Sequence, residues 1–441
     1  MSVWQKVKNY YHRAQALASS VFFGFPSKKL MVIGVTGTDG KTTTVNMIYH
    51  ILKSSDKKVS MVSSVSAQIG QKSYDTGFHV TTPSPWNIQK YLKQAKDSGC
   101  EYFVLEATSH GLDQNRLAFV NFKVGVITNI THEHLDYHQT WQNYAKAKSK
   151  LFSEVQFSIL NKDDKKSFDF LKNNISGKVI TYSLKKGSDV NLANFPVKLK
   201  ISGRHNLSNA LAAAAVCHAL GIDKKIILNA LTNFPGVIGR MEELKMGQDF
   251  KMIVDFAHTP NGLEQALKTL KSNVKSHPFD KLRSSTLRSS TPRLRLEELR
   301  PEGMTLSSPK GQMSKVIVVF GAAGLRDQSK RPIMGKIAGQ LADRVVLTAE
   351  DPRTEKTEDI MDQIAQGLIS QGKKEGKDFF KIANRRQAIE YAITTLAEKG
   401  DIVATFGKSH EKSMTYGKKD YPWDEFQAVK EAIRKRLKNG E

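Results

Sequence analysis

The sequence GVTGTDGKTTT, residues 34–44, decides the fold because it joins an apolar run at residues 30–35 to a helical pattern that starts near Lys41. Glycines let backbone N–H groups turn toward phosphate oxygens, and a helix N-terminus adds partial positive charge. In such a loop Lys41 reaches the β- and γ-phosphates, and the Thr42 hydroxyl holds Mg²⁺. The spacing departs from the usual motif, since Val35 stands where the first glycine is expected. We predict a nucleotide site here rather than a glycine-rich turn that binds nothing.

Short apolar runs alternate with helical patterns along the rest of the chain, which predicts mostly parallel sheets with helices on both faces. The later runs are residues 102–105, 124–128 and 158–160, and then 252–254, 316–320, 345–347 and 402–405. We predict an α/β protein in which a central P-loop domain with a mostly parallel sheet (residues 30–232) is followed by a C-terminal Rossmann-like α/β domain (residues 233–441). Pro235, Gly236 and Gly239 mark the linker.

Two segments fall outside this alternation. Residues 1–29 predict a short helical segment, in which basic residues precede a mostly apolar stretch at residues 16–25. No small-residue cleavage pattern follows, so a secretion signal is disfavoured, and we expect an amphipathic helix that packs on the body or rests on a membrane surface. Residues 276–312 lose apolar periodicity and contain LRSST twice in tandem, at residues 282–291. That composition predicts a disordered insertion.

The bulk composition bounds the class of protein. The net charge of +24 fits nucleic-acid binding or a basic surface for anionic small molecules. The second interpretation is favoured because the lysines are spread along the chain and no recognition module stands out; we expect no nucleic-acid partner. The two cysteines form no disulfide framework, which suits a reducing cytoplasm. No run approaches the roughly 18 apolar residues of a transmembrane segment.

Further polar side chains stand where ligands collect in α/β proteins. The apolar residues 102–105 end in Glu106, and the carboxyl ends of parallel strands are ligand sites, so Glu106 is a second candidate for Mg²⁺. The alternative is a solvated glutamate. His132, His134 and His138 lie close together in sequence. Their i, i+2, i+6 spacing on a loop fits no zinc pattern well, and polar loop histidines are the plain alternative.

A series of longer segments makes the pattern specific. They are TGTDGKTTT (36–44), LEATSHGL (105–112), TNITHEHLDYH (128–138), YAKAKSKLF (144–152), SGRHNLSNALAA (202–213), GVIGRMEEL (236–244), VDFAHTPNGLEQAL (254–267), FGAAGLRDQSKRPIMG (320–335), AEDPRTE (349–355) and FGKSHE (406–411). In this order they resemble the Mur ligase family, from about residue 30 to the C-terminus with only the insertion unmatched. SHGL, HLDYH, FAHTP and the DPR–GKSHE pair resemble the tripeptide-synthetase branch rather than folylpolyglutamate synthase or other Mur ligases.

The resemblance implies a reaction. ATP phosphorylates a peptide carboxylate of the acceptor, an amino group attacks the acyl phosphate, and an amide, ADP and phosphate result. The acceptor implied is a nucleotide-sugar dipeptide of peptidoglycan synthesis, and the incoming group is a diamino acid. One departure is large, because the branch carries an N-terminal domain that grips the uridine diphosphate end, whereas only about 29 residues precede the first strand here. We expect that grip to be reduced, replaced or supplied elsewhere.

The resemblance also implies roles for residues. Those implied to bind ATP are Gly37, Thr38, Asp39, Gly40, Lys41, Thr42, Thr43, Asn206, Arg240 and Asp255. Those implied to hold metal are Thr42, Glu106, His134 and Lys148, with Lys41, Lys148 and His134 as the catalytic set. Those implied to bind the substrates are Thr81, Thr82, Ser109, His138, Arg326, Asp351, Arg353, Gly407 and Glu411. Lys148 aligns with a lysine that the family carbamylates, whereas its position alone suggests a helix-surface lysine. Asn206 could equally cap a helix.

The DPR motif bears on the amino acid. A bidentate guanidinium at Arg353 suits the distal carboxylate of meso-diaminopimelate, which lysine lacks. Asp351 replaces the usual Asn and could repel that carboxylate or pair with Arg353, and Ser409 replaces a glycine of the family pattern. Lysine is therefore the second candidate. The alternatives for the whole chain are a Mur-type ligase with another acceptor or amino acid, or a P-loop ATP-binding protein without ligase activity. We expect a cytoplasmic monomer.

Overall fold

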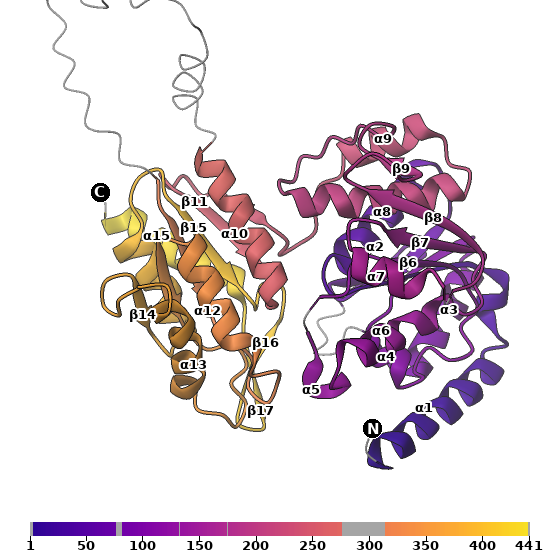
Figure 1. Cartoon of the computed structure of the whole chain (residues 1–441), viewed down its shortest axis with the longest axis horizontal. Helices are drawn as coiled ribbons and strands as arrows, with labels where there is room; N and C mark the ends of the chain where they lie inside the picture. Colours follow the sequence, from indigo (N-terminus) through magenta and orange to yellow (C-terminus); the bar gives the residue numbers. More distant parts are fainter. Residues whose placement is uncertain (1–2, 76–81, 132, 174, 276–313, 440–441) are drawn as a thin grey trace, which may run out of the picture.

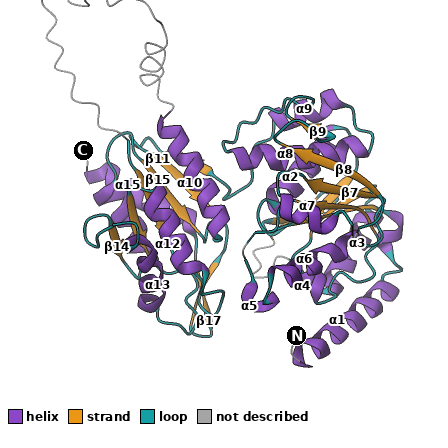
Figure 2. Cartoon of the chain, viewed as in Figure 1, coloured by secondary structure: helices purple, strands orange, loops and turns teal. Residues whose placement is uncertain are grey.

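The structure is a computed structural model of the chain, and it describes residues 3–75, 82–131, 133–173, 175–275 and 314–439. Two sheets, each covered by helices on both faces, lie side by side, and the N-terminal helix lies at the outer edge of the first (Figure 1). Figure 2 shows the same layering by element type. No helix in these ranges is long and apolar enough to cross a membrane. The predicted α/β class is confirmed.

The first sheet has the strand order β4-β3-β2-β5-β1-β6-β7-β8-β9. Its strands from β2 to β9 pair in parallel, whereas β3 and β4 add an antiparallel edge. The strands are β1 (Met31–Thr36), β2 (Val59–Val62), β3 (Ser66–Ile69), β4 (Lys72–Asp75), β5 (Tyr102–Glu106), β6 (Phe122–Ile127), β7 (Phe157–Asn161), β8 (Lys178–Ser183) and β9 (Val190–Asn191). The mostly parallel sheet predicted around the phosphate loop is confirmed.

Helices bury apolar side chains on both faces of this sheet. One face packs on α2 (Lys41–Ser54), α8 (Arg204–Ala219) and α9 (Lys224–Thr232). The apolar face of α2 that starts at Val45 is buried, as its helical spacing predicts. The other face packs on α3 (Pro85–Asp97), α4 (Ser109–Asp113), α6 (Trp141–Ser149), η2 (Lys150–Phe152) and α7 (Lys165–Leu171), with α5 (Leu135–His138) beside α6.

The second sheet has the order β10-β11-β15-β12-β13-β14, parallel except for β10. Its strands are β10 (Glu242–Leu244), β11 (Lys251–Asp255), β12 (Val316–Phe320), β13 (Arg344–Leu347), β14 (Phe379–Lys381) and β15 (Ile402–Phe406), and β16 (Ser413–Tyr416) and β17 (Lys419–Pro422) form a separate hairpin. One face packs on α10 (Pro260–Lys275), α12 (Lys330–Leu341) and α13 (Thr357–Ile369), the other on α14 (Arg385–Tyr391), η3 (Ala392–Leu396) and α15 (Glu425–Asn439).

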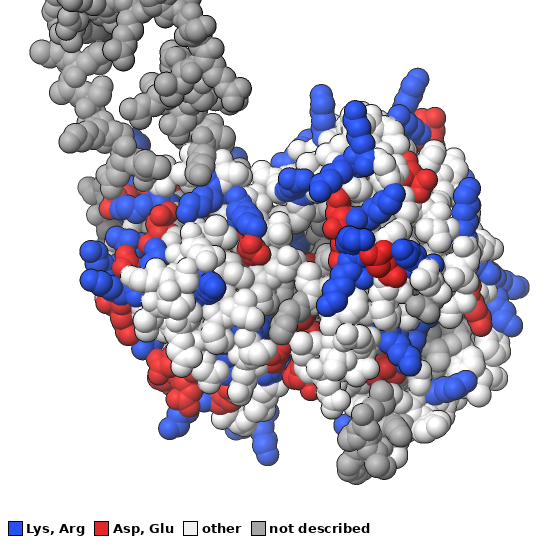
Figure 3. Space-filling model, in the orientation of Figure 1, with Lys and Arg blue, Asp and Glu red and all other residues white. Residues whose placement is uncertain are grey.

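Two connections complete the fold. Helix α1 (Val3–Phe22) packs against α3 and is followed by the short η1 (Pro26–Lys29). Residues 233–241 carry the chain from α9 to β10, between the two sheets. The predicted insertion at residues 276–312 lies outside the described residues. On the face in Figure 3, Lys and Arg side chains are spread over both units and interspersed with Asp and Glu.

Candidate active site

The phosphate loop connects β1 to α2, as predicted. Its two glycines have positive φ, 148° at Gly37 and 82° at Gly40, where larger residues are strained. Space excludes a side chain as well, because a Cβ on Gly37 would lie 1.8 Å from the Thr128 hydroxyl oxygen. Gly40 precedes α2 and no described side chain caps that helix, so its first N–H groups are left to bind an anion.

Oxygen atoms converge beside the start of α2. The Thr42 hydroxyl donates to Glu106 Oε2 at 2.9 Å and lies 2.8 Å from the Ser64 hydroxyl. The Ser64 N–H donates to the same Glu106 oxygen at 2.9 Å. Glu106 reaches this point because β5 pairs with β1 and ends beside the loop. Hydroxyl and carboxylate oxygens are the hard ligands that Mg²⁺ takes, so this donor set fits the ion. Ser64 was missed by the sequence, since nothing in its surroundings singles it out.

Two lysines of the predicted site lie against the loop, Lys148 buried and Lys41 half-buried. Lys41 Nζ donates to the Thr38 carbonyl at 2.7 Å, and burial lowers the pKa of Lys41. Lys148, on α6, donates from Nζ to the Gly37 carbonyl at 2.7 Å and lies 4.4 Å from the centre of the Tyr144 ring. Burial holds the pKa of Lys148 well below its ordinary value. The plain alternative, a helix-surface lysine, is therefore wrong for Lys148.

Three histidines gather next to this region. His134 has a positive φ of 56° at the start of α5, and its ring centre lies 4.8 Å from that of His110. His138 Nε2 lies 3.1 Å from the Ser109 hydroxyl oxygen. Burial lowers the pKa of His138 to about 4 and that of His110 to about 3, so both rings are neutral at pH 7. His110 was not singled out from the sequence, although it lies inside the quoted SHGL motif. His132 lies outside the described residues.

The remaining residues predicted to bind the acceptor peptide are Thr81, Thr82 and Ser109, and Ser109 lies against His138. The Thr82 hydroxyl lies 2.8 Å from that of Thr108, whose side chain caps α4 just before Ser109. Thr81 lies outside the described residues. Within the described ranges, no group of three or more His, Cys, Asp or Glu side chains is placed to hold a metal ion.

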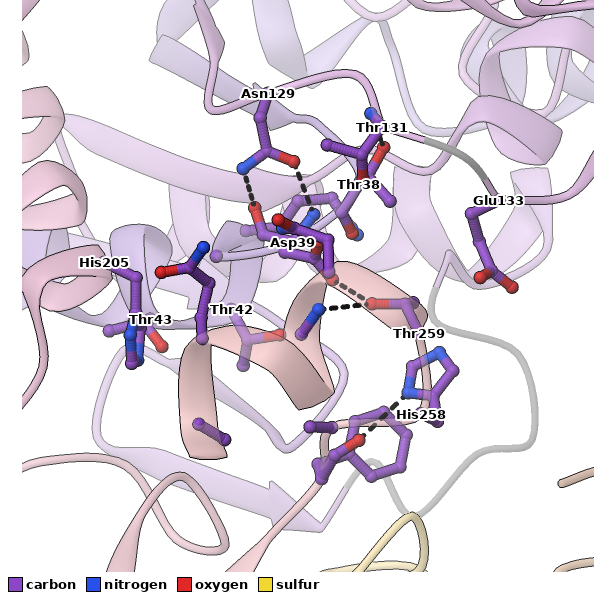
Figure 4. A pocket seen from close by; sticks show the side chains of 18 of the residues that line it. Thr38, Asp39, Thr42, Thr43, Asn129, Thr131, Glu133, His205, His258 and Thr259 are labelled. Atoms are coloured by element: carbon purple, nitrogen blue, oxygen red, sulfur yellow. Dashed lines mark hydrogen bonds between the residues drawn. The ribbon is translucent and has the colours of Figure 1, made fainter. Parts of the chain in front are cut away.

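Side chains of the second unit reach the phosphate loop across the cleft. The Thr259 hydroxyl donates to one carboxylate oxygen of Asp39 at 2.8 Å (Figure 4). The Asn261 amide donates to the other carboxylate oxygen at 2.7 Å. Arg240 Nη2 donates to the Thr42 hydroxyl at 3.2 Å, and its guanidinium lies 4.6 Å from the centre of the Phe256 ring. The sequence placed Arg240 beside ATP but did not single out the Asp39 partners.

A buried ion pair forms a second link between the units. Lys330 Nζ lies 3.1 Å from Glu133 Oε1 and donates to the His258 carbonyl at 2.9 Å. Burial raises the pKa of Glu133. Both residues lie inside quoted motifs, yet their pairing across 197 positions could not be read from either segment.

The asparagines of α8 and the acid of β11 support the cleft wall. The side chain of Asn206 donates to the Ser202 carbonyl at 2.7 Å, and it lies inside α8 while Gly203 precedes the helix. The alternative that Asn206 caps the helix is therefore wrong. Asn209 lies against Gly40, where a Cβ would come within 2.3 Å of its Oδ1. Asp255 accepts the N–H groups of Met241 and Ala257, which fixes the chain where it enters the second unit.

The loops after β13 and β15 carry a compact charge cluster. Lys408 Nζ, fully buried, contacts Asp351 Oδ1 at 2.9 Å and Glu411 Oε2 at 2.5 Å. Asp351 therefore pairs with Lys408, not with Arg353 as one alternative had it. Arg353 instead donates from Nη1 to the Gly324 carbonyl at 2.7 Å. Lys408 was missed, although it lies between the predicted Gly407 and Glu411.

Glu350 is a further buried acid of this cluster. Burial raises the pKa of Glu350 to about 8, even though three cations near it act in the opposite direction. A Cβ on Gly407 would come within 2.1 Å of its Oε2, so glycine is required for the acid to sit there. Glu350 was not singled out from the sequence, because it stands next to Asp351 and two adjacent acids are typical of a solvent-exposed loop.

One cavity of about 890 Å³ joins the phosphate loop to this charge cluster. Its lining includes Thr38–Thr43, Glu106, His134, Asn206, Arg240, Asp255, Arg326, Asp351, Arg353, Gly407 and Glu411 from the predicted set. The described predicted residues that do not line this cavity are Gly37, Thr82, Ser109, His138 and Lys148. The volume suits substrates of more than one kind held together.

Known proteins match both units. The Mur ligase middle domain matches residues 35–217, and the Mur ligase glutamate ligase domain matches residues 304–409. The UDP-N-acetylmuramoyl-L-alanyl-D-glutamate–2,6-diaminopimelate ligase of Clostridium tetani is 35% identical over 97% of this chain and 82% of its own, and that of Bacteroides fragilis is 34% identical over 94% and 80%.

Solved structures share the fold. A UDP-N-acetylmuramoyl-L-alanyl-D-glutamate–2,6-diaminopimelate ligase superposes with a TM-score of 0.55 at 28% identity, over 92% of this chain and 79% of that one. Mycobacterium tuberculosis folylpolyglutamate synthase superposes with a TM-score of 0.63 at 15% identity, over 90% and 93%. A phosphate loop on one sheet and a charged pocket on the next line one cavity. With the matched domains and relatives, they identify an ATP-dependent ligase that forms amide bonds. The chain belongs to the Mur ligase family, in the part of it that builds peptidoglycan precursors.

Proposed function

We propose that the chain joins meso-diaminopimelate to a peptide carboxylate of a UDP-N-acetylmuramoyl-dipeptide. The relatives of about one-third identity carry this activity in their names. The observation that carries the proposal is the single cavity, which has the phosphate loop in one wall and Arg326, Arg353 and Glu411 in the other. A carboxylate activated beside the loop is then within reach of an amine held by the second unit.

The nucleotide half acts by position and charge. Lys41 and the first N–H groups of α2 hold the phosphates of ATP, and Gly37, Thr38, Asp39, Gly40 and Thr43 shape the loop. Thr42 and Glu106 would hold Mg²⁺, with His134 as a further ligand. Arg240 reaches Thr42 from the second unit, which sets a cation beside the transferred phosphoryl group. Asn206 and Asp255 form the wall on the nucleotide side.

Lys148 acts as a carbamate. Only a neutral amine attacks carbon dioxide, and burial keeps the Lys148 pKa well below its ordinary value. The neutral amine nitrogen bonds to the carbon of CO₂, one proton leaves the nitrogen, and the neutral side chain becomes an anion. That anion would be a ligand for a second Mg²⁺. In the uncarbamylated side chain Nζ lies 2.7 Å from the Gly37 carbonyl, directly under the phosphate loop.

The acceptor and the amino acid enter from opposite units. Thr82, Ser109 and His138 contact the acceptor peptide. Arg326 and Arg353 take carboxylates of the amino acid, since a guanidinium binds a carboxylate in two places. Asp351 and Glu411 face its amino groups beside Gly407. Because Asp351 forms its ion pair with Lys408 rather than with Arg353, the Arg353 guanidinium remains available to a carboxylate of the ligand.

The test is phosphate release by the purified chain with a panel of acceptors and amino acids. We expect turnover only when a UDP-N-acetylmuramoyl-dipeptide and a diamino acid are both present, from a cytoplasmic enzyme that runs as a monomer. Turnover with a sugar-free or lipid-linked acceptor instead would show that the chain is a Mur-type ligase with a different acceptor. Elution from a size-exclusion column at the volume expected of a dimer would contradict the predicted monomer.

A further inference from the structure

Helix α1 presents its large apolar side chains to solvent. The face that packs on the body carries small or polar residues, among them Ala16, Ser19 and Ser20. The opposite face is exposed, with Tyr10 73% and Phe22 70% accessible. We call this face the apolar stripe; it consists of Val7, Tyr10, Tyr11, Leu17, Val21 and Phe22. Apolar side chains on the outward face of a helix in a water-soluble body are a binding surface rather than a core.

The stripe is continuous along the helix. Its members recur at three- and four-residue intervals, and the exposed Ala14 and Ala18 fill the gap between Tyr11 and Val21 on the same side. An aromatic cluster extends the stripe onto α3, because the Trp86 ring lies 5.0 Å from the rings of both Phe22 and Phe23. Trp86 is itself 40% exposed. Aromatic side chains of this kind settle at the boundary between water and lipid.

Charge completes the pattern. Helical geometry places Lys8 on one flank of the stripe and Arg13 on the other, and both are exposed. No Asp or Glu occurs in α1, and the exposed Lys28 and Lys29 follow in η1. Long basic side chains on the flanks of an apolar face can reach lipid phosphates while the face lies in the acyl boundary.

We propose that the apolar stripe docks on an anionic membrane surface, with α1 lying in the plane of the bilayer. Charge complementarity selects this occupant. A second copy of α1 laid against the stripe would bring two basic flanks together with no carboxylate of either helix between them. A neutral apolar protein surface would leave Lys8 and Arg13 without partners. Docking needs no spanning helix, and the catalytic cleft stays in water.

The experiment is flotation of the full chain with lipid vesicles, either of phosphatidylcholine alone or of equal parts phosphatidylcholine and phosphatidylglycerol. Three variants are compared with the wild type. The stripe variant is Tyr10→Ser, Leu17→Ser and Phe22→Ser; the charge variant is Lys8→Gln and Arg13→Gln. The control variant is Val179→Ser, Ile226→Ser and Ile369→Ser, which removes exposed apolar side chains from β8, α9 and α13.

We expect wild type and control to float with the anionic vesicles. The stripe variant should bind at least about tenfold more weakly, because large apolar groups no longer leave water. The charge variant should lose the preference for anionic lipid, and added salt should weaken wild-type binding. Equal flotation of wild type and stripe variant would overturn the proposal. So would wild-type self-association that the stripe mutations abolish, since the occupant would then be a second copy. If the stripe variant fails to fold, unchanged binding by the charge variant is still decisive against the proposal.

Discussion

The two walls of the cleft are built by different means. The nucleotide side is built mainly from the backbone: glycines with positive φ, a helix start that no described side chain caps, and one carboxylate, Glu106, that accepts from the Thr42 hydroxyl and the Ser64 N–H. On the amino-acid side the work is done by buried charges. Lys408 lies between two carboxylates, and Glu350 is an acid with a raised pKa.

A buried arginine shows how the second wall is held. Arg385 pairs through two nitrogens with Glu425, at 2.8 and 2.6 Å. Its remaining donors reach the carbonyls of Ala349 and Phe406, where the loops after β13 and β15 begin. A wall built from the backbone is disrupted when the backbone conformation changes. A wall built from buried charges is disrupted when one charge loses its partner or changes its protonation state. The first should therefore be sensitive to single residues, and the second to pairs and to pH.

The largest effect should come from the first wall. Lys41→Ala should lower ATP turnover about 10³-fold, because the transferred charge loses its cation. Thermal unfolding should stay close to wild type, since the removed ammonium makes one hydrogen bond to the Thr38 carbonyl. Lys53→Ala, an exposed position on the same helix, is the matched control and should be fully active. Turnover near wild type in Lys41→Ala would remove this loop from the chemistry.

Lys148→Ala should come next, with a loss of about 10²-fold, because it removes one anionic ligand rather than the phosphate grip. Small carboxylic acids such as acetate should restore part of the activity by replacing the carbamate. Lys146→Ala, two positions away and exposed, should remain active and should not respond to acetate. A fully active Lys148→Ala enzyme would rule out any role for this lysine, and an inactive one without rescue would count against the carbamate.

The difference between the two walls also explains which parts of the site could be predicted from the sequence. The loop of residues 34–44 was predicted in detail because glycine at a left-handed position and a lysine at a helix start have few substitutes. The core strands beside it were predicted by their apolar runs, as β5 and β15 illustrate. The antiparallel edge of β3 and β4 was missed, since short strands with half-polar sequences carry little periodicity.

The second wall was predicted only in outline. Its motif residues Asp351, Arg353 and Glu411 were identified, but their pairing was left open between repulsion and an ion pair. The structure gives a third outcome, Lys408 between two acids. Such pairings join residues 57 positions apart, as in Lys408 and Asp351. They depend on how β13 and β15 align in the sheet, which local patterns do not encode.

A smaller effect, on selectivity, should follow from Arg353→Ala. Wild type should release phosphate faster with meso-diaminopimelate than with lysine, because lysine leaves the guanidinium without a carboxylate, a cost of about 1–3 kcal/mol. The variant should narrow that gap by lowering the rate with diaminopimelate. Arg386→Ala, an exposed arginine of α14, is the matched control and should keep the wild-type ratio. A preference for lysine that the variant leaves unchanged would contradict the assignment of this pocket.

The smallest effect should be a change in how stability depends on pH, and it tests whether the second wall is governed by charge balance. In the folded protein the pKa of Glu350 is raised from 4.5 to about 8, so the folded state keeps a proton that the unfolded chain releases. The contribution of this group to the free energy of unfolding is complete below pH 4.5 and is lost as the pH rises to about 8; at higher pH this group causes no further change.

Glu350→Gln keeps the shape of the side chain and removes the titration, so the melting temperature of the variant should fall less than that of wild type between pH 5 and 8.5. Glu358→Gln, at an exposed position of α13, should follow the wild-type curve. Parallel melting curves for wild type and Glu350→Gln over this interval would mean that Glu350 is already ionised in the fold, and the acid would then belong to the ion-pair network of Lys408 rather than stand as a neutral member of the wall.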